Sequence, residues 1–432
     1  MKKAMIYGLG ISGTGAKELL EKEGYETIVV DDKKAMTSEE ALNHLDGLEF
    51  FIKSPGIPYN DFVKEVQKRG IKILDEIEIA YNYMIEKGLK TKIIAITGTN
   101  GKSTTTAKIS DMLNHAGYKA AYAGNIGRSL SEVLLKEKDL DFISLELSSF
   151  QLENIENFKP YISMIINMGP DHIERYKSFD EYYDTKFNIT KNQTEDLYFI
   201  ENIDDVEIEK RAKQIKAKRI SVSKFKKADI FVKNDKICHG ENTIIDVDKL
   251  SLKGIHNLEN TLFMVATAEI LKIDKEKLKE FLMIATPLEH RTELFFNYGK
   301  LKFINDSKAT NVDSTKFAIQ ANKNSILICG GYDKGVDLAP LAEMIKKNIK
   351  EVYLIGVIAD KIESELKKIG YENSRIHKLV NIENSLQDMK KRFTKDSDEV
   401  ILLSPATSSY DQFNSFEHRG KVFKELVLKI FG

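Results

Sequence analysis

The sequence lacks several features that mark specialised classes of protein. Its 432 residues include two cysteines, Cys238 and Cys329, whose separation gives neither a disulfide framework nor metal-ligand spacing. We therefore expect two buried thiols. No apolar run approaches the ~18 residues that span a membrane. Strand-like residues 4–7 lead directly into a glycine loop instead of a signal peptide, so we expect no membrane insertion.

An excess of either charge is also absent. The chain has 65 basic and 66 acidic residues, a formal charge of −1, and the charges are interspersed. Because a nucleic acid or a membrane surface would select a basic patch, the charge points to neither as a partner. With no signal peptide expected, we expect a cytoplasmic protein. The length corresponds to about three domains at ~150 residues each, and we place them at 1–90, 91–290 and 291–432.

A strand, a glycine loop and a helix follow one another between Lys92 and Ala116. Residues 93–96 form a short apolar run rich in β-branched side chains, which is typical of a buried strand. After the loop, apolar residues recur at helical spacing and the pattern closes at Gly117; they are Ile109, Met112, Leu113 and Ala116. The segment predicts an amphipathic helix from Ser103 onward, with one face on a sheet.

The loop between them, Gly-Thr-Asn-Gly-Lys-Ser, is typical of a phosphate-binding turn. Gly98 and Gly101 let backbone N–H groups approach an anion at the start of the helix. Lys102 would reach the terminal phosphates, and the Ser103 hydroxyl can ligate Mg²⁺. The loop is a short variant, because Ile96 occupies the position of the first glycine in the common pattern. A strand-to-helix turn without a phosphate role is the alternative.

A second glycine loop lies near the N-terminus. Residues 3–7 form a predicted strand, and Gly8-Leu-Gly-Ile-Ser-Gly13 precedes a predicted helix. The next strand ends at Asp31 and Asp32, so the pattern fits the dinucleotide fingerprint, in which an acid binds the ribose. The segment offers about four strands instead of two mononucleotide halves and therefore favours another anion over NAD. A dehydrogenase and a purely structural turn remain as alternatives.

Polar side chains follow three further predicted strands of the middle segment. They are Asn125 after residues 119–123, Glu146 within residues 142–147, and His172 after residues 161–166. The alternating helices predict a parallel sheet, whose ligands lie beyond the carboxyl ends of the strands. Glu146 with Ser103 would form a first Mg²⁺ site, and His172 could serve a second. Taken singly, Glu146 could be a solvent-facing strand residue and His172 an ordinary loop residue.

Two other residues of this segment have open roles. Lys186 falls on a predicted helix at 182–190, and its ammonium would repel Mg²⁺, so the default interpretation is a surface lysine. Asn260 belongs to a helix that opens after Gly254, where amides could contact a base or a ribose. Capping of that helix by Asn257 is the alternative.

The last segment begins after Pro287 and repeats the alternation of strands and helices. Predicted strands lie at 294–298, 301–304, 325–328, 352–355 and 400–403, which predicts a second doubly wound α/β unit. Its loops carry residues that could bind a small carboxylate or act only as caps and turns: Asp306, Lys308, Thr310, Lys334 and Ser409. The fold class is therefore α/β in three domains, namely a Rossmann-like nucleotide-binding domain, a central P-loop ATPase-like parallel sheet and a C-terminal doubly wound Rossmann-like domain.

Taken together, the motifs resemble the Mur ligase family, the ATP-dependent amide ligases of peptidoglycan precursor synthesis, across essentially the whole chain. The phosphate-binding loop alone fits several members. Four further motifs resemble the branch that adds D-glutamate to UDP-N-acetylmuramoyl-L-alanine: Gly124-Asn-Ile-Gly127, Glu146-Leu-Ser-Ser-Phe-Gln-Leu-Glu153, Asn305-Asp-Ser-Lys-Ala-Thr-Asn311, and Ser404-Pro-Ala with Asp411-Gln-Phe.

The resemblance implies four groups of site residues. The UDP-linked substrate would contact Gly10, Ile11, Ser12, Asp31, Ser54, Pro55, Gly56, Asn125 and His172. ATP would contact Gly98, Thr99, Asn100, Gly101, Lys102, Ser103, Thr104, Asn260, Arg291 and Asp306. D-glutamate would contact Lys308, Thr310, Lys334, Ser409 and Phe416. Catalysis would rest on Lys102, Glu146, His172 and Lys186, and metal binding on Ser103, Glu146, His172 and a carbamoylated Lys186.

The implied reaction passes through an acyl phosphate. ATP would phosphorylate the alanyl carboxylate of the UDP-linked substrate, and the amine of D-glutamate would displace the phosphate, with two Mg²⁺ ions and a CO₂-derived carbamate on Lys186. We expect a monomer. The alternatives are a ligase for another amino acid, a dehydrogenase based on Gly8 to Gly13, and a non-enzymatic ATP-dependent switch.

Overall fold

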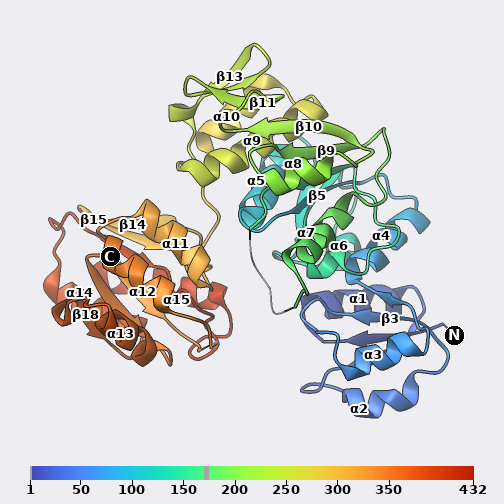
Figure 1. Cartoon of the computed structure of the whole chain (residues 1–432), viewed down its shortest axis with the longest axis horizontal. Helices are drawn as coiled ribbons and strands as arrows, with labels where there is room; N and C mark the ends of the chain where they lie inside the picture. Colours follow the sequence, from blue (N-terminus) through green and yellow to red (C-terminus); the bar gives the residue numbers. More distant parts are fainter. Residues whose placement is uncertain (1, 170–174, 334) are drawn as a thin grey trace. The chain divides into compact units, whose positions relative to one another are not determined.

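The computed structural model describes residues 2–169, 175–333 and 335–432 and divides into two compact units, Met1–Thr286 and Pro287–Gly432. Within the described residues, the first unit contains two sheets and the second contains one (Figure 1). The α/β class expected from the sequence is confirmed. The domain boundaries at residues 90 and 290 stay a prediction.

The first sheet has the strand order β2-β1-β3-β4, with every pairing parallel. Its strands are β1 (Lys3–Tyr7), β2 (Glu26–Val30), β3 (Leu48–Lys53) and β4 (Ile73–Leu74). Successive side chains of a strand point to opposite faces, so Ala4 and Ile6 join one core and Met5 and Tyr7 another. Helices α1 (Ile11–Lys22) and α4 (Glu76–Glu86) cover the first face, and α2 (Ser38–Ala41) and α3 (Asp61–Lys68) cover the second.

The second sheet has nine strands in the order β13-β12-β11-β10-β9-β8-β5-β7-β6. They are β5 (Lys92–Thr97), β6 (Ala120–Gly124), β7 (Phe142–Glu146), β8 (Ile162–Ile165), β9 (Tyr198–Asn202), β10 (Lys218–Ser223), β11 (Ile230–Lys233), β12 (Lys236–His239) and β13 (Asn242–Asp246). The pairings from β6 to β11 are parallel, which confirms the prediction for the strands around the phosphate loop. Strands β12 and β13 add an antiparallel edge.

Helices cover both faces of this second sheet. Helices α5 (Lys102–His115), α9 (Ile255–Leu271) and α10 (Lys275–Ile284) share a core with Ile94 and Ile96 of β5 (Figure 1). Ile93 and Ala95 face the other way, into a core that also contains residues of α1, α4, α6 (Leu130–Lys136) and α8 (Val206–Ala212). The first and second sheets are therefore packed together through one continuous core. Helix α7 (Phe179–Phe187) carries Lys186.

The second unit is built on a six-stranded sheet of order β14-β15-β19-β16-β17-β18. Its strands are β14 (Glu293–Tyr298), β15 (Leu301–Asn305), β16 (Ile326–Gly330), β17 (Glu351–Ile355), β18 (Ile376–Lys378) and β19 (Val400–Leu403), and β14 alone of these pairs antiparallel. Helices α11 (Val312–Ala321), α12 (Ala339–Asn348) and α13 (Ala359–Lys368) pack on one face, and α14 (Ile382–Arg392) and α15 (Phe416–Phe431) on the other. The predicted doubly wound arrangement is confirmed.

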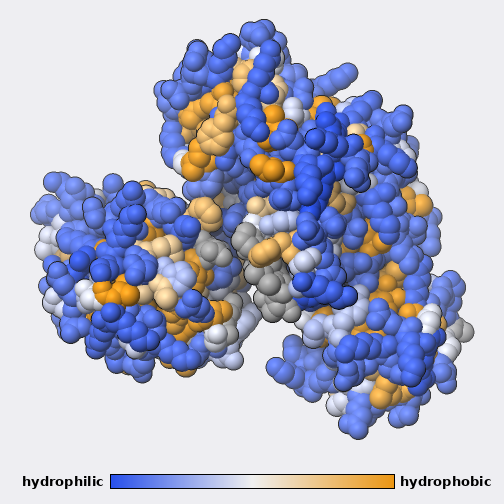
Figure 2. All heavy atoms as spheres, in the orientation of Figure 1, coloured by the Kyte–Doolittle hydropathy of each residue, from blue (hydrophilic) through white to orange (hydrophobic). Residues whose placement is uncertain are grey.

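The surface agrees with the composition. Hydrophilic side chains cover most of the face shown in Figure 2, and apolar side chains lie scattered among them. Among the described residues, no helix has the length and apolar character needed to cross a membrane. Both cysteines are free and buried, as expected.

Candidate active site

The predicted phosphate loop connects β5 to α5 and depends on two glycines with positive φ. Gly98 has φ +150° and Gly101, the residue before α5, has φ +82°, a region that side chains with a Cβ rarely adopt. Space is limited as well, since a Cβ on Gly101 would stand 2.4 Å from Oδ1 of Asn260 in α9. Asn260 therefore lies against the loop, and its contact with the nucleotide stays a prediction.

Asn167, which follows β8, fixes the backbone of the same loop. Its Oδ1 accepts from the Asn100 N–H at 2.8 Å, and its carbonyl accepts from the Thr99 N–H at 2.9 Å. Its Nδ2 donates to Glu259 of α9 at 2.9 Å. Asn167 directly follows the strand predicted at 161–166, but the sequence pattern indicates no role for it, because nothing local connects it to a loop some 70 residues away.

Two lysines converge on the carbonyl of Gly98. Lys102 donates to the Gly98 and Thr99 carbonyls, both at 2.9 Å, and Lys186 donates to the Gly98 carbonyl at 2.9 Å. Lys186 is 2% exposed and lies 4.7 Å from the ring centre of Tyr182. The default interpretation of Lys186 as a surface lysine is therefore wrong: packing of α7 against the loop buries it.

Glu146 ends β7 next to the phosphate-loop strand, and it is 2% exposed. The alternative of a solvent-facing residue is therefore wrong. Asn125 donates to its Oε1 at 3.0 Å, while Oε2 has no hydrogen-bond partner among the described residues. An unpartnered buried carboxylate oxygen is costly unless a cation is bound there. Glu146 and the buried hydroxyl of Ser103 are oxygen donors of the kind that Mg²⁺ prefers, so this part of the site fits the ion. His172 lies outside the described residues.

The N-terminal glycine loop follows β1 and is closed by contacts from two neighbouring loops. Asp31 accepts from the Leu9 N–H at 2.9 Å, and this bond with that from the Lys33 N–H lowers the pKa of the carboxyl. Ser54 donates from Oγ to the Gly8 carbonyl at 2.8 Å. A Cβ on Gly13, in the first turn of α1, would lie 1.9 Å from that carbonyl, so only glycine fits at this position.

This arrangement brings together most of the residues expected to bind the UDP-linked substrate. Gly10, Ile11 and Ser12 lie at the start of α1, and Ile11 is 62% exposed. The Ser54-Pro55-Gly56 turn lies against the same loop through Ser54. One carboxylate oxygen of Asp31 accepts a hydrogen bond from the loop backbone at Leu9, and the other accepts one from the Lys33 N–H.

In the second unit, the predicted residues lie at the carboxyl ends of β15 and β19. Asp306 is buried, accepts from Ser404 Oγ at 2.7 Å and from the Thr292 N–H at 3.0 Å, and burial raises its pKa to about 6. Arg291 lies close enough for its charge to oppose that rise.

The residues expected to bind D-glutamate are distributed over the adjoining loops. Lys308 is half-buried, with its Nζ 5.6 Å from the ring centre of Phe416, the first residue of α15. Ser409 is buried and its carbonyl accepts from the Phe413 N–H. Thr310 is half-buried in the loop after β15. Lys334 lies outside the described residues.

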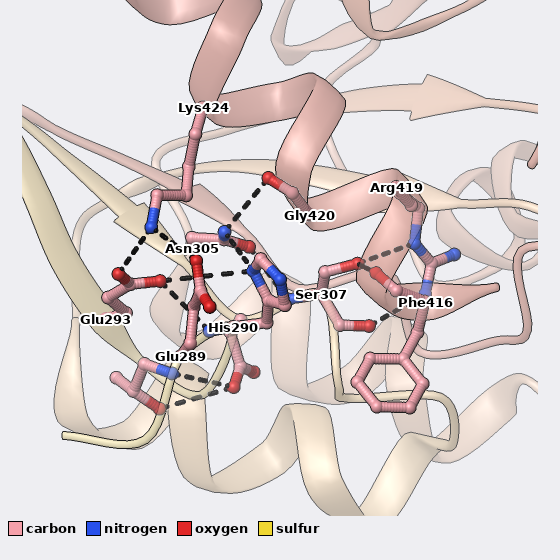
Figure 3. A network of polar contacts seen from close by, with 11 residues as sticks. Glu289, His290, Glu293, Asn305, Ser307, Phe416, Arg419, Gly420 and Lys424 are labelled. Carbon is pink, nitrogen blue, oxygen red and sulfur yellow. Dashed lines mark hydrogen bonds and ion pairs between the residues drawn. The ribbon is translucent and has the colours of Figure 1, made fainter. Parts of the chain in front are cut away.

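Arg419, which the sequence did not single out, joins these loops (Figure 3). It is 1% exposed, and burial lowers its pKa to about 10. Its Nε donates to Ser307 Oγ at 3.0 Å, and its Nη atoms donate to the carbonyls of Ser307 and Thr407. An arginine among charged neighbours on a helix looks exposed in sequence, so no local signal marks it.

His290 lies beside this network, in surroundings that favour the neutral imidazole. Asn305 donates from Nδ2 to His290 Nδ1 at 2.9 Å (Figure 3), so that nitrogen must be an acceptor, and burial lowers the pKa of the imidazole. Glu289, His290 and Glu293 have the spacing of a metal site. However, Lys424 donates to both carboxylates, at 2.9 and 2.8 Å, so its ammonium already occupies the place between them that a cation would take.

Comparison with known proteins identifies the family. Residues 96–268 match the Mur ligase middle domain. The chain is 95% identical over its full length, and the full length of the relative, to a UDP-N-acetylmuramoylalanine--D-glutamate ligase of Fusobacterium nucleatum. It is 36% identical to the ligase of the same name from Natranaerobius thermophilus, covering 100% of this chain and 98% of the relative. The chain belongs to the Mur ligase family.

Solved Mur ligases have the same fold. The UDP-N-acetylmuramate-alanine ligase MurC of Thermotoga maritima matches with a TM-score of 0.64 at 18% identity, covering 99% of both chains. The MurF ligase of the same organism, solved with ADP, matches with a TM-score of 0.60 at 14% identity, covering 91% of both chains. The family resemblance and the fold class are confirmed, and the roles of individual residues in this Mur ligase stay predictions.

Proposed function

We propose that the protein joins D-glutamate to UDP-N-acetylmuramoyl-L-alanine at the expense of ATP, in the cytoplasm, as a step of peptidoglycan precursor synthesis. The 95% identity over the whole chain to a ligase named for that reaction is the observation that carries the proposal. The four motifs that resemble the D-glutamate-adding branch lie on loops after β6, β7, β15 and β19, where the ligands of parallel sheets bind.

The nucleotide triphosphate is bound by the loop between β5 and α5. Residues 98–104 supply backbone N–H groups at a helix N-terminus, where the partial positive charge favours phosphate. The Lys102 ammonium donates to the Gly98 and Thr99 carbonyls of this loop. When ATP binds, the ammonium would leave these carbonyls and contact the γ-phosphate. Asn260, Arg291 and Asp306 are proposed to contact the rest of the nucleotide.

Two Mg²⁺ ions are proposed, held by Ser103 and Glu146 and by His172 and a carbamate on Lys186. The ions would offset negative charge on the phosphates during transfer. The burial of Lys186 against the Gly98 carbonyl supports this role, because it places the amine at the phosphate loop. Addition of CO₂ to the neutral amine forms an N–C bond, releases a proton and converts the group into an anion.

The UDP portion of the substrate is proposed to lie on the N-terminal glycine loop. The exposed start of α1, the Ser54-Pro55-Gly56 turn and Asp31 surround that loop, and the helix N-terminus favours a diphosphate. Asn125 is proposed to contact the muramoyl end. Lys308, Thr310, Lys334, Ser409 and Phe416 are proposed to bind D-glutamate, with a lysine suited to its side-chain carboxylate.

The reaction needs no nucleophile from the protein. The alanyl carboxylate attacks the γ-phosphorus of ATP, an O–P bond forms, and ADP leaves. The free amine of D-glutamate then attacks the acyl carbon, and loss of phosphate with a proton from nitrogen leaves the amide. Lys102 would stabilise charge on the phosphoryl group in the first step, which is the positioning and electrostatic role expected in phosphoryl transfer.

The test is phosphate release from ATP and Mg²⁺ with UDP-N-acetylmuramoyl-L-alanine and D-glutamate supplied separately and together. Release that needs both substrates supports the proposal. Release with another amino acid but not with D-glutamate would keep the family and overturn the substrate assignment. Reduction of NAD by either substrate would instead support the dehydrogenase alternative.

A further inference from the structure

A cluster of charged side chains joins the first and second sheets of the first unit; the side chain of Lys53 is fully buried, and those of Glu153 and Arg175 are 12% and 15% exposed. Lys53 ends β3, and Glu153 follows the short helical turn Phe150–Leu152 after β7. Lys53 Nζ lies 3.6 Å from Glu153 Oε2. Arg175 forms a bidentate ion pair with the Glu153 carboxylate, with Nε 2.9 Å from Oε1 and Nη2 2.7 Å from Oε2. The carboxylate of Glu153 therefore pairs with two cations.

Both cations also hold the turn that follows β3. Arg175 donates from Nη1 to the Pro55 carbonyl at 2.9 Å, and Lys53 donates to the Ile57 carbonyl at 3.1 Å. The turn itself is closed by the Ile57 N–H on the Ser54 carbonyl at 3.0 Å. The two carbonyls on the outside of the turn are thus fixed by the cluster centred on Glu153.

This turn is also hydrogen-bonded to the N-terminal glycine loop. Ser54 donates from Oγ to the Gly8 carbonyl at 2.8 Å, and its N–H donates to the Tyr7 carbonyl at 3.0 Å. A continuous chain of hydrogen bonds therefore runs from Glu153, on the segment that carries Glu146, to the loop at the start of α1. One end of this chain is the loop proposed to bind the UDP-linked substrate, and the other is the segment whose Glu146 is proposed to bind Mg²⁺.

The energetics point to geometry and not to stability as the role of the cluster. The Lys53 side chain is 0% exposed, and burial lowers the pKa of its ammonium. Burying charged groups costs free energy that their attraction often fails to exceed, and well-packed apolar replacements are frequently as stable. The orientation is fully specified instead: Arg175 stacks 3.9 Å from the ring centre of Phe150, and Tyr176 donates to Glu153 Oε1 at 3.1 Å.

We propose that Glu153, acting through Lys53 and Arg175, is a positioning residue for the UDP-linked substrate. It sets the Ser54-Pro55-Gly56 turn and the Gly8 loop at a fixed distance from the phosphate loop of the second sheet. The diphosphate anchor and the reacting carboxylate of one long substrate are then held in register. The inference rests on the proposed function.

The test is the variant Glu153→Gln, which keeps the size of the side chain and removes the charge between the cations. We expect the KM for UDP-N-acetylmuramoyl-L-alanine to rise about tenfold or more, with kcat and the KM for ATP changed by no more than about twofold. Glu156→Gln is the matched control, because Glu156 forms a surface ion pair with Lys72 across the same two sheets. It should leave all three constants unchanged.

An equal loss in all constants, or an unchanged KM for the UDP-linked substrate, would overturn the positioning role. If Glu153→Gln does not fold, Arg175→Lys tests the same point, since lysine keeps the charge but cannot form the bidentate ion pair with Glu153. Calorimetric titration without turnover then compares the affinities of this variant for the UDP-linked substrate and for ADP. A selective loss for the former supports the proposal, and an equal or absent loss overturns it. Failure of the wild-type protein to ligate D-glutamate would overturn the proposed function instead.

Discussion

Asn260 of α9 stands directly over Gly101 at the start of α5, so that a Cβ on the glycine would approach Asn260 Oδ1 to 2.4 Å. The two residues are 159 positions apart in sequence, yet one sets the space available to the other. The nucleotide loop is therefore constrained twice at the same position, by its backbone conformation and by the amide packed on it.

Substitution Gly101→Ala should abolish binding of ATP. The new Cβ must push Asn260 away, and φ +82° is strained for alanine. Gly117→Ala at the other end of α5 is the matched control, because φ is +98° there but the nearest atom to a Cβ is Lys277 Nζ at 3.8 Å. Both variants should lose about 1 kcal/mol of stability or more, whereas calorimetric titration with ATP should show lost affinity in Gly101→Ala alone. Normal affinity in that variant would contradict the constraint.

Substitution Lys102→Ala should reduce ligation below detection, because the ammonium that offsets charge on the transferred phosphoryl group is removed. Lys108→Met on the same helix is the control. Lys108 is buried, whereas Lys102 is half-buried, and Lys108 pairs with Asp111 at 2.6 Å, which places its charge in a structural pair. Phosphate release should persist in Lys108→Met, and substantial turnover by Lys102→Ala would remove the loop from the mechanism.

The sequence predicted the elements whose chemistry is local. Residues 93–96 alternate between two apolar cores, and this two-sided burial produces the continuous apolar run that identified the strand. Gly98 and Gly101 could likewise be identified because their backbone conformations exclude most other residues. Such features depend on residues that are neighbours in the chain, so a single sequence suffices to find them.

Residues whose roles depend on distant partners could not be predicted from the pattern. Lys186 shares its helix with acidic residues and looks exposed, but it is buried and donates a hydrogen bond to a carbonyl 88 residues earlier in the chain. Arg419 likewise becomes a bridge only because β15 and β19 pair and bring Ser307 and Thr407 together. For Lys186 the family resemblance supplied a role, carbamoylation at a metal site, that stays a prediction.

Substitution Glu146→Gln should separate stability from activity. Its Oε2 has no partner among the described residues, so loss of the buried charge should leave the melting temperature unchanged or higher. Loss of the metal ligand should raise the Mg²⁺ concentration for half-maximal phosphate release about tenfold or more. Glu201→Gln is the control, since Glu201 is a buried carboxylate of β9 that pairs with Arg219 at 3.4 Å. An unaltered Mg²⁺ dependence in Glu146→Gln would exclude it as a ligand.

Carbamoylation of Lys186 can be observed directly. With ¹³C-labelled bicarbonate, the wild-type protein should show a carbamate carbon resonance, and Lys186→Arg should lose both that resonance and ligation, because arginine cannot carry the group. Lys191→Arg serves as the control: Lys191 lies one turn further along and donates to the Ile155 carbonyl at 3.0 Å. A resonance that persists in Lys186→Arg would assign the carbamate to another lysine.

Stability should fall between mildly acidic and neutral pH because of Glu76, the first residue of α4. The side chain accepts from the Ser131 N–H at 2.6 Å, and burial raises its pKa from 4.5 to about 7. The folded state therefore keeps a proton that the unfolded state releases, so the stabilisation is complete below pH 4.5 and is lost as the pH rises through about 7. The glutamine in Glu76→Gln cannot ionise. The free energy of unfolding of this variant, relative to that of the wild type, should therefore rise by about 1–3 kcal/mol between pH 5 and pH 8. Urea unfolding at the two pH values measures this difference, and a gap between the proteins that does not change with pH would show that Glu76 ionises normally in the fold.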